Sequence, residues 1–591
     1  MKNQLSICLS FIIGAALYGC GGGVSGSSST GGGVAKSQGC ITSACHGGAT
    51  ILVGISPVTG VSIVDEWKSS THYRMNAAGC TDCHTHSHLN SCTSCHGGGV
   101  PTGSDTVVDC LKCHVTGSPR KPLDVNHLTS KTPFTNLTSA IPDNYDSAGY
   151  FVMQGTSHVS KCIWCHNPHN TSLGVELKDW SASAHGDLEA PAFRFYDFKV
   201  HGTDNATPAK STAEDCVRCH TATGYIDYAI SDYTDIRPWG AARNLNGSVK
   251  RDYKKKVIPI SNQKQVLYCT VCHDPGASYG SESAYGFKRR RVNPVTAHYN
   301  YSSGKAKKIT AAKYPNLAVR FPDLGDSSIC MACHVGREAG ATLKAAALEG
   351  EDFTNVGFID SHYLAAGAVL FKSSGFEFYT SAKKYQNYSY FEHSVIGVNN
   401  TSGTGVAGPC IGCHMTPNRH TLSALNVTPG PSGTPLDGTI TSIVSDLCIS
   451  CNKDTHALTV SDLQAAKNGF KKALDALKQQ LQVQKGIYYG ATSYPYFFKS
   501  PVFSFFNAFK NWGTPEVMGA AFDLHILSHE YGAYAHNDLY TKRLIYDSID
   551  FIDDGVLNFS VGATLTLTGE TEAKSYLVNP KGAQFTAAER P

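Results

Sequence analysis

The residues of this 591-residue chain with the clearest chemical meaning are short units of the form C-x-x-C-H. The first is Cys80-Thr81-Asp82-Cys83-His84, and seven more have the same spacing. Two thiols three residues apart can form thioether bonds to the vinyl groups of one porphyrin, and the adjacent histidine can place an imidazole nitrogen on the iron. The series therefore predicts covalently attached c-type haem.

Each unit supplies two cysteines for attachment and one histidine as an iron ligand. Zinc is the competing interpretation, but a zinc knuckle needs four ligands, and a histidine directly after every second cysteine is not its pattern. The attachment residues are Cys80, Cys83, Cys92, Cys95, Cys110, Cys113, Cys162, Cys165, Cys216, Cys219, Cys269, Cys272, Cys330, Cys333, Cys410 and Cys413, and the ligands are His84, His96, His114, His166, His220, His273, His334 and His414.

A ninth cysteine pair has a wider loop. Cys40, Cys45 and His46 form a C-x4-C-H unit. Its terminal histidine predicts another haem, and a disulfide or redox pair beside an unrelated histidine is the alternative.

The tenth pair departs further, because Cys448 and Cys451 are followed by Asn452, a poor iron ligand. Three interpretations stay open: a haem bound by His456 or a remote histidine, a haem with an open iron position, and a disulfide or vestigial site. The open position would matter most, since substrate binds only to iron with a vacancy. The cofactor prediction is nine or ten haems c.

Histidines beyond the motifs can supply second iron ligands. Of 25 histidines, nine end a motif and sixteen remain, enough to close every iron with a second imidazole. Trp67-x4-His72 and Trp180-x4-His185 are predicted to be one short turn used twice. His525, His529 and His536 lie in a different kind of sequence and are not assigned to iron. The predicted second ligands are His72, His86, His88, His127, His158, His169, His185, His201, His298, His362, His393, His420 and His456.

The first residues predict export from the cytoplasm. The apolar run from Leu5 to Leu17 is too short for a permanent membrane span, so residues 1–19 are interpreted as a signal peptide. The run ends in Leu17-Tyr18-Gly19-Cys20, which resembles a bacterial lipobox and predicts lipidation of Cys20. Ordinary cleavage that leaves a spare thiol is the alternative. Residues 20–38 are then a Gly/Ser tether.

Composition narrows the class of protein. The net charge of +3 argues against a nucleic-acid partner. Long apolar periodic segments are scarce before residue 460, so the interior is expected to be filled with porphyrin instead of aliphatic side chains. The predicted fold is a multihaem cytochrome c domain over residues 39–457, mostly loops and short α-helices wrapped on a haem stack.

A C-terminal helical region is predicted over residues 458–560. Ser461 is the expected N-cap of a first helix of about 22 residues that ends at Gly486. A second helix is expected from Pro515 to His529, and Asn537 with His536 is expected to cap a third.

Residues 561–591 are interpreted as a tail. Its Thr564 to Leu567 segment alternates polar and apolar residues, which predicts strand-like turns.

With these motifs, the chain resembles the outer-membrane multihaem c-type cytochromes of dissimilatory metal-reducing bacteria. The resemblance covers the lipobox, the tether, the nine haem sites and the tail that opens a helix at Gly532, and Gly21 after Cys20 implies sorting to the outer membrane. The tail is also similar to the C-terminal helices of the nitrite reductase and hydroxylamine oxidoreductase superfamily. That family's C-x-x-C-K motif is absent. Lys453 lies one residue beyond the position, directly after Cys451, where the motif would place its lysine.

The expected function is electron transfer along closely spaced bis-histidine haems. The resemblance implies a lipoprotein at the cell surface or periplasmic face of the outer membrane, with periplasmic cytochromes as donors and an extracellular metal oxide or similar acceptor. A reductase of nitrite, hydroxylamine or a sulfur oxyanion is the alternative and requires one open haem. A third possible function is that of a structural subunit in a cytochrome filament or a porin–cytochrome conduit. The prediction leans away from an enzyme.

Overall fold

The computed structural model describes part of the chain. The described residues are 63–69, 84–85, 106–107, 179–180, 182–186, 192, 219–220, 225, 267, 269–273, 289–290, 293–299, 309, 313–381, 384–386, 393–397, 407–415, 419–452, 458–578 and 589–591. The chain divides into two compact units, Met1–Val108 with Pro168–Thr171 and Asp109–Asn167 with Ser172–Pro591. In the first unit the structure describes α2 (Ile63–Ser69) and the antiparallel pair β1 (His84–Thr85) and β2 (Thr106–Val107).

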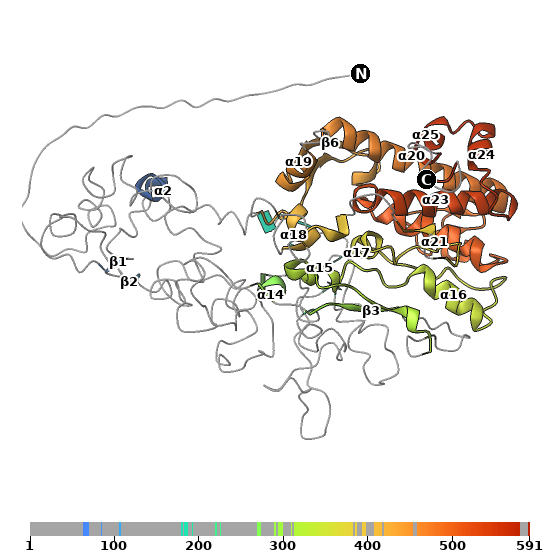
Figure 1. Cartoon of the computed structure of the whole chain (residues 1–591), viewed down its shortest axis with the longest axis horizontal. Coiled ribbons are helices and arrows are strands. Elements are labelled where there is room, and N and C mark those ends of the chain that lie inside the picture. Colours follow the sequence, from blue (N-terminus) through green and yellow to red (C-terminus); the bar gives the residue numbers. More distant parts are fainter. Residues whose placement is uncertain are drawn as a thin grey trace, which may run out of the picture. The chain divides into compact units, whose positions relative to one another are not determined.

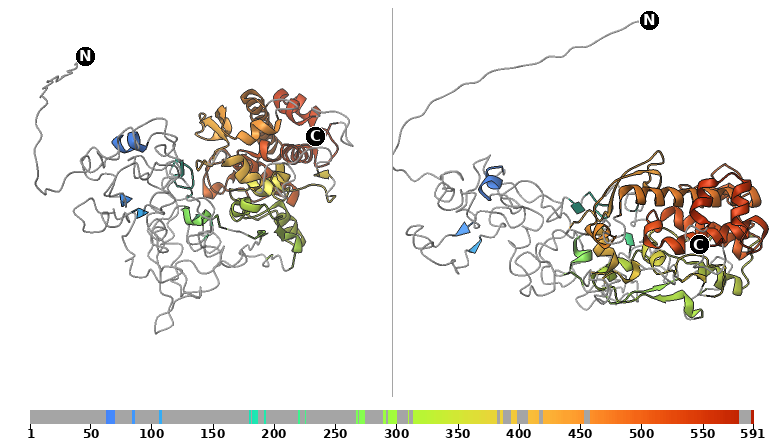
Figure 2. Two further views of the ribbon diagram at one scale, coloured as in Figure 1. Left: turned by 60° about the vertical axis from the view of Figure 1, so that its left-hand side comes forward. Right: turned by 45° about the horizontal axis from the view of Figure 1, so that its top comes forward.

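Three long helices dominate the described part of the second unit (Figures 1 and 2). They are α20 (Val460–Lys485), α21 (Pro515–His529) and α23 (Asp538–Asp554). The expected bounds of α21 and the expected cap Asn537 are confirmed, since the Asn537 side chain accepts a hydrogen bond from the Tyr540 amide.

The first of these helices begins two residues earlier than expected. Its N-cap is Thr459, whose hydroxyl accepts from the Asp462 amide, so the prediction of Ser461 was wrong. Asp462 completes a capping box with Thr459, and this reciprocal pair outcompetes Ser461. The predicted end is confirmed: Gly486 takes a left-handed φ of 66°, which glycine adopts without steric cost.

The prediction of strand-like turns in the tail was wrong, because α24 (Val561–Leu567) and α25 (Thr571–Leu577) are helices. Two carboxylates at the end of α23 fix the start of α24. Asp550 accepts from the Ser560 amide at 2.7 Å, and Asp553 accepts from the Ser560 hydroxyl at 2.9 Å. A four-residue alternation carries too little information to reveal such a tertiary constraint.

Shorter elements make up the rest of the described part of the second unit, in agreement with the expected loops and short helices. The helices are α14 (Cys269–Cys272), α15 (Ser328–Met331), α16 (Gly340–Leu348), α17 (Ala366–Leu370), α18 (Gly408–His414), α19 (Asp446–Asn452) and α22 (Ala533–His536). The antiparallel pairs are β3 (Thr296–His298) with β4 (Ala318–Arg320), β5 (Leu425–Thr428) with β6 (Thr439–Ile443), and β7 (Tyr488–Tyr489) with β8 (Phe497–Phe498). The 3-10 turns are η4 (Pro315–Leu317), η5 (Gly325–Ser327), η7 (His393–Val395), η8 (Pro435–Asp437) and η9 (Phe505–Asn507).

A conventional apolar core supports these elements, which the expectation of a porphyrin-filled interior did not include. Phe470 of α20, Phe522 of α21 and Leu544 of α23 are fully buried in one cluster. Leu343 of α16 and Val369 of α17 belong to the same cluster, so the core also includes the short helices that follow the C-x-x-C-H unit ending in His334. None of the helices in the described ranges combines the length and apolar character needed to cross a bilayer.

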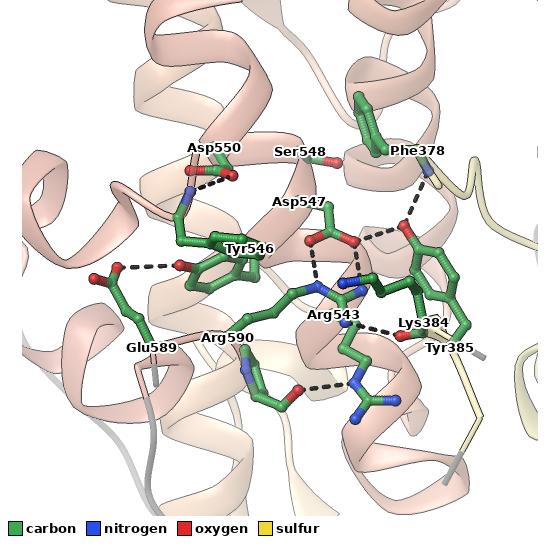
Figure 3. Close-up of polar contacts among 12 residues, drawn as sticks. Phe378, Lys384, Tyr385, Arg543, Tyr546, Asp547, Ser548, Asp550, Glu589 and Arg590 are labelled. Atoms are coloured by element: carbon green, nitrogen blue, oxygen red, sulfur yellow. Dashed lines mark hydrogen bonds and ion pairs between the residues drawn. The ribbon is translucent and has the colours of Figure 1, made fainter. Parts of the chain in front are cut away.

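A buried ion pair ties residues 589–591 into this helical region. The Arg590 guanidinium donates to both carboxylate oxygens of Asp547, at 2.6 and 2.7 Å (Figure 3). Asp547 is fully buried and the Arg590 side chain is 6% exposed. Tyr385 donates to the same carboxylate at 2.6 Å. Because the charges are paired inside the protein, removing one leaves the other without its partner.

We therefore expect Arg590→Ala to lower the free energy of unfolding by about 3–5 kcal/mol, because it leaves the Asp547 carboxylate buried without its ion-pair partner. Denaturant unfolding followed by circular dichroism measures the loss.

The matched control is Lys471→Ala, which removes an exposed i,i+4 partner of Asp475 on α20. Its expected cost is about 0.3–0.5 kcal/mol. Equal effects of the two substitutions would contradict the structural role assigned to Arg590.

Candidate haem sites

Four C-x-x-C-H units have histidine side chains within the described ranges, namely those ending in His220, His273, His334 and His414. Cysteines of three of them lie on the short helices α14, α15 and α18. Residues three apart share one face of a helix, so a single helical turn can present both thiols of a unit to the same side.

Each of these four motif histidines faces a histidine from a distant part of the chain. The ring centroids are 6.0 Å apart for His220 and His362, 6.2 Å for His334 and His185, 6.3 Å for His273 and His420, and 6.2 Å for His414 and His536.

This spacing fits a metal ion between the two rings. With metal–nitrogen bonds of about 2.0–2.1 Å and about 1.1 Å from nitrogen to ring centre, two imidazoles on opposite sides of a metal have centroids about 6.3 Å apart. The centroids of His525 and His529 are only 4.4 Å apart, which leaves no such room. Across the described residues, no group of three His, Cys, Asp or Glu side chains forms a metal-ion site, so a zinc knuckle is not found there.

His185 lies on the turn expected from the Trp180-x4-His185 pattern. The Ser183 hydroxyl donates to the Trp180 carbonyl at 2.7 Å and accepts from the His185 amide at 3.3 Å. The Trp180 indole donates to the Leu267 carbonyl, and the Leu267 amide donates to the His185 carbonyl. The turn is therefore held against the segment that precedes α14.

His362 is held on an unusual loop. Its φ is 59° and that of Leu364 is 63°, a left-handed conformation that ordinary residues avoid and that often marks functional sites. Asp360 stabilises the bend by accepting from the His362 amide at 2.8 Å. The Gly367 amide donates to the His334 carbonyl at 2.7 Å, so α17, which directly follows the His362 loop, contacts the unit that ends in His334.

His420 is positioned by Asp179, which accepts from its amide at 3.2 Å and from the guanidinium of Arg419 at 3.4 Å. Asp179 directly precedes Trp180, which begins the turn of His185. One carboxylate thus joins the segments that carry two of the facing histidines.

His536 ends α22, and its side chain is fixed on two sides. Its Nδ1 lies 3.1 Å from Oε1 of Glu530. A Cβ atom on Gly532 would lie 2.9 Å from its Cε1, so only glycine lets the ring lie this close to the backbone.

Backbone carbonyls orient two motif histidines in the same way. The Nδ1 of His220 lies 2.7 Å from the Ala192 carbonyl, and that of His414 lies 3.0 Å from the Leu422 carbonyl. A carbonyl only accepts, so Nδ1 carries the proton and Nε2 keeps its lone pair. This is the second contact that metal-bound histidines usually make.

Burial favours the neutral imidazole, which is the form that binds iron. His536 differs: burial is the largest single effect and acts to lower its pKa, but the adjacent Glu530 carboxylate and the Cys410 thiol together raise it above its ordinary value. Burial lowers the pKa of His185, His362 and His414 to about 4, and it lowers the pKa of His220 and His334.

Cysteines of successive motifs are neighbours. The thiols of Cys330 and Cys410 are hydrogen-bonded, and Cys448 is hydrogen-bonded to Cys413. The irregular tenth pair starts on α19, a short helix like those of the regular motifs, and α19 packs against α18.

Several predicted ligands take other positions. His298 is exposed on β3. His393 donates from Nδ1 to the Ala535 carbonyl at 2.6 Å. Neither makes a ring contact with a motif histidine in the described part of the chain, and their assignment as ligands stays a prediction.

Sequence reasoning missed His536, which faces His414. The available signal was its local sequence. Small residues make up three of the four positions before His536, in Gly532-Ala533-Tyr534-Ala535, and all four positions before His185, in Ser181-Ala182-Ser183-Ala184. His525 and His529, also left unassigned, contact aromatic rings and backbone carbonyls.

The remaining predicted site residues are not described at side-chain level. Only the backbone is described for His84, Cys269 and Cys451. Outside the described residues lie Cys20, Cys40, Cys45, His46, Cys80, Cys83, Cys92, Cys95, His96, Cys110, Cys113, His114, Cys162, Cys165, His166, Cys216, His72, His86, His88, His127, His158, His169, His201 and His456.

Comparison with known proteins finds relatives over most of the chain. The C-type polyheme cytochrome OmcC of Geobacter sulfurreducens is 32% identical over 84% of this chain and 68% of its own length. The C-type polyheme cytochrome OmcB of the same species is 30% identical over 91% of this chain and 69% of its own length. No family model matches, and no solved structure matches.

Proposed function

This chain belongs to the outer-membrane polyhaem c-type cytochromes, and we propose that it passes electrons along bis-histidine haems between periplasmic donors and extracellular acceptors. Haem supplies a reversible one-electron couple when bound. The chain's part is to attach each porphyrin, supply two imidazoles to its iron and keep neighbouring sites close.

The observation that carries the proposal is the facing of all four described motif histidines by a second histidine at 6.0–6.3 Å. In each pair, one imidazole comes from the attachment unit and the other from a remote turn or loop. An iron held on both faces has no position for substrate, so such sites suit electron transfer better than catalysis. This favours a conduit over the reductase alternative.

Contacts between sites support close spacing. The Cys330 and Cys410 thiols are hydrogen-bonded, so the attachment units that contain them are direct neighbours. The Gly336 amide donates to the Leu364 carbonyl at 2.9 Å, which joins the segment after His334 to the His362 loop. Short separations between cofactors are what a conduit requires, and these contacts fix them through the backbone.

We propose ten haems. Cys448 and Cys451 lie three apart on α19, in the arrangement that α14 and α18 give the regular units. Asn452 cannot act as the iron ligand, so a histidine from elsewhere, such as His456, takes that place.

The proposed anchor is a lipid on Cys20, followed by the tether of residues 20–38. This agrees with the outer-membrane location of the family. Other c-type cytochromes are the proposed partners, an extracellular metal oxide or similar solid is the proposed acceptor, and a porin or further copies of the chain complete the proposed assembly.

We expect the oxidised protein to show only low-spin haem by electron paramagnetic resonance. His185→Ala, His362→Ala, His420→Ala and His536→Ala should each convert one haem to high spin, because each removes one imidazole from one iron.

His529→Gln is the matched control, since both ring nitrogens of His529 already face carbonyls, those of His525 and Ala491. It should leave every haem low-spin. High-spin haem in the unaltered protein would favour the reductase instead, and unchanged spectra in all four variants would refute the pairing.

The intact mass of the mature protein should contain ten haem increments. The double substitution Cys448→Ala with Cys451→Ala should remove one of them, because no thiol is left to form its thioether bonds. Nine increments in the unaltered protein, unchanged by the double substitution, would show that the tenth pair carries no haem.

A further inference from the structure

Glu530 holds a buried carboxylate against a proposed iron ligand. It directly follows α21, and its Oε1 lies 3.1 Å from Nδ1 of His536. Only 9% of the Glu530 side chain is exposed. The Glu530 amide donates to the Ile526 carbonyl, and its carbonyl accepts from the Ala533 amide, so its backbone is fixed at both ends.

The same contacts decide which ring nitrogen is available to a metal. The His536 amide donates to the Gly532 carbonyl at 2.9 Å, which closes a helical turn beneath the ring. With Nδ1 directed at Glu530, Nε2 is the nitrogen left to face His414.

The two histidines of this pair therefore have different second contacts. Nδ1 of His414 donates to a neutral carbonyl, that of Leu422, whereas Nδ1 of His536 lies 3.1 Å from Oε1 of the Glu530 carboxylate. A carboxylate makes the imidazole a stronger electron donor than a carbonyl does, and it adds a negative charge close to the iron. Both effects stabilise the oxidised iron more than the reduced iron, because the oxidised site carries one more positive charge.

We propose that Glu530 is a positioning residue that orients His536 through its Nδ1 and lowers the reduction potential of the haem held by Cys410, Cys413 and His414. The inference rests on the proposed pairing of His414 with His536. In this proposal, the Glu530 carboxylate sets the reduction potential of one haem in the electron-transfer series.

The test is Glu530→Gln, which keeps the size of the side chain and an oxygen acceptor for Nδ1 but removes the charge. Potentiometric titration with visible and electron paramagnetic resonance detection should show one haem shifted to a more positive potential, with all haems still low-spin. The low-spin signal that changes should be the one that disappears in His536→Ala.

Glu516→Gln is the matched control. It neutralises a glutamate in the first turn of the same helix, about 21 Å along the helix axis from position 530 at 1.5 Å per residue. It should leave the potentials unchanged.

Unaltered potentials in Glu530→Gln, with a high-spin haem in His536→Ala, would overturn this inference and leave the proposed function intact. A purely structural role would instead appear as lost haem or high-spin signal in Glu530→Gln without a shift of potential, and would also overturn it. A low-spin spectrum in His536→Ala would refute the pairing itself.

Discussion

The distance between facing imidazoles is the constraint on which the proposed haem sites of this protein depend. Two histidines can share one iron only if their ring centres stay near 6.3 Å, and the four described pairs lie at 6.0–6.3 Å. One member of each pair ends an attachment unit, while the other lies at least 122 residues away in the sequence. The backbone between them must therefore be held rigidly.

Several local devices provide that rigidity. The turn of His185 is closed by Ser183, and the loop of His362 by Asp360. In the sequence, the short helix that ends in His536 lies between α21 and α23, and both of these helices are buried in a conventional apolar core. The buried ion pair of Asp547 and Arg590 ties α23 to residues 589–591 (Figure 3).

The four facing histidine pairs share one ring spacing, but the electrostatic surroundings of their imidazoles differ. Burial keeps most paired imidazoles neutral, and a backbone carbonyl orients His220 and His414. Glu530 makes the environment of His536 different, since it places a carboxylate near Nδ1, where His220 and His414 have a backbone carbonyl. Variation of this kind lets one repeated motif produce haems of unequal potential.

The sequence determined the attachment chemistry, because C-x-x-C-H is local: two thiols and an imidazole within five residues need no distant partner. It also determined the bounds of α21 and the cap at Gly486, which depend on neighbouring residues. The second ligands depend on long-range packing. Spacing points to His185 but not to His536, and the alternation from Thr564 to Leu567 predicts strand-like turns where the structure has a helix. Only the tertiary structure decided which histidine faces which motif, since residues far apart in the chain meet solely through the fold.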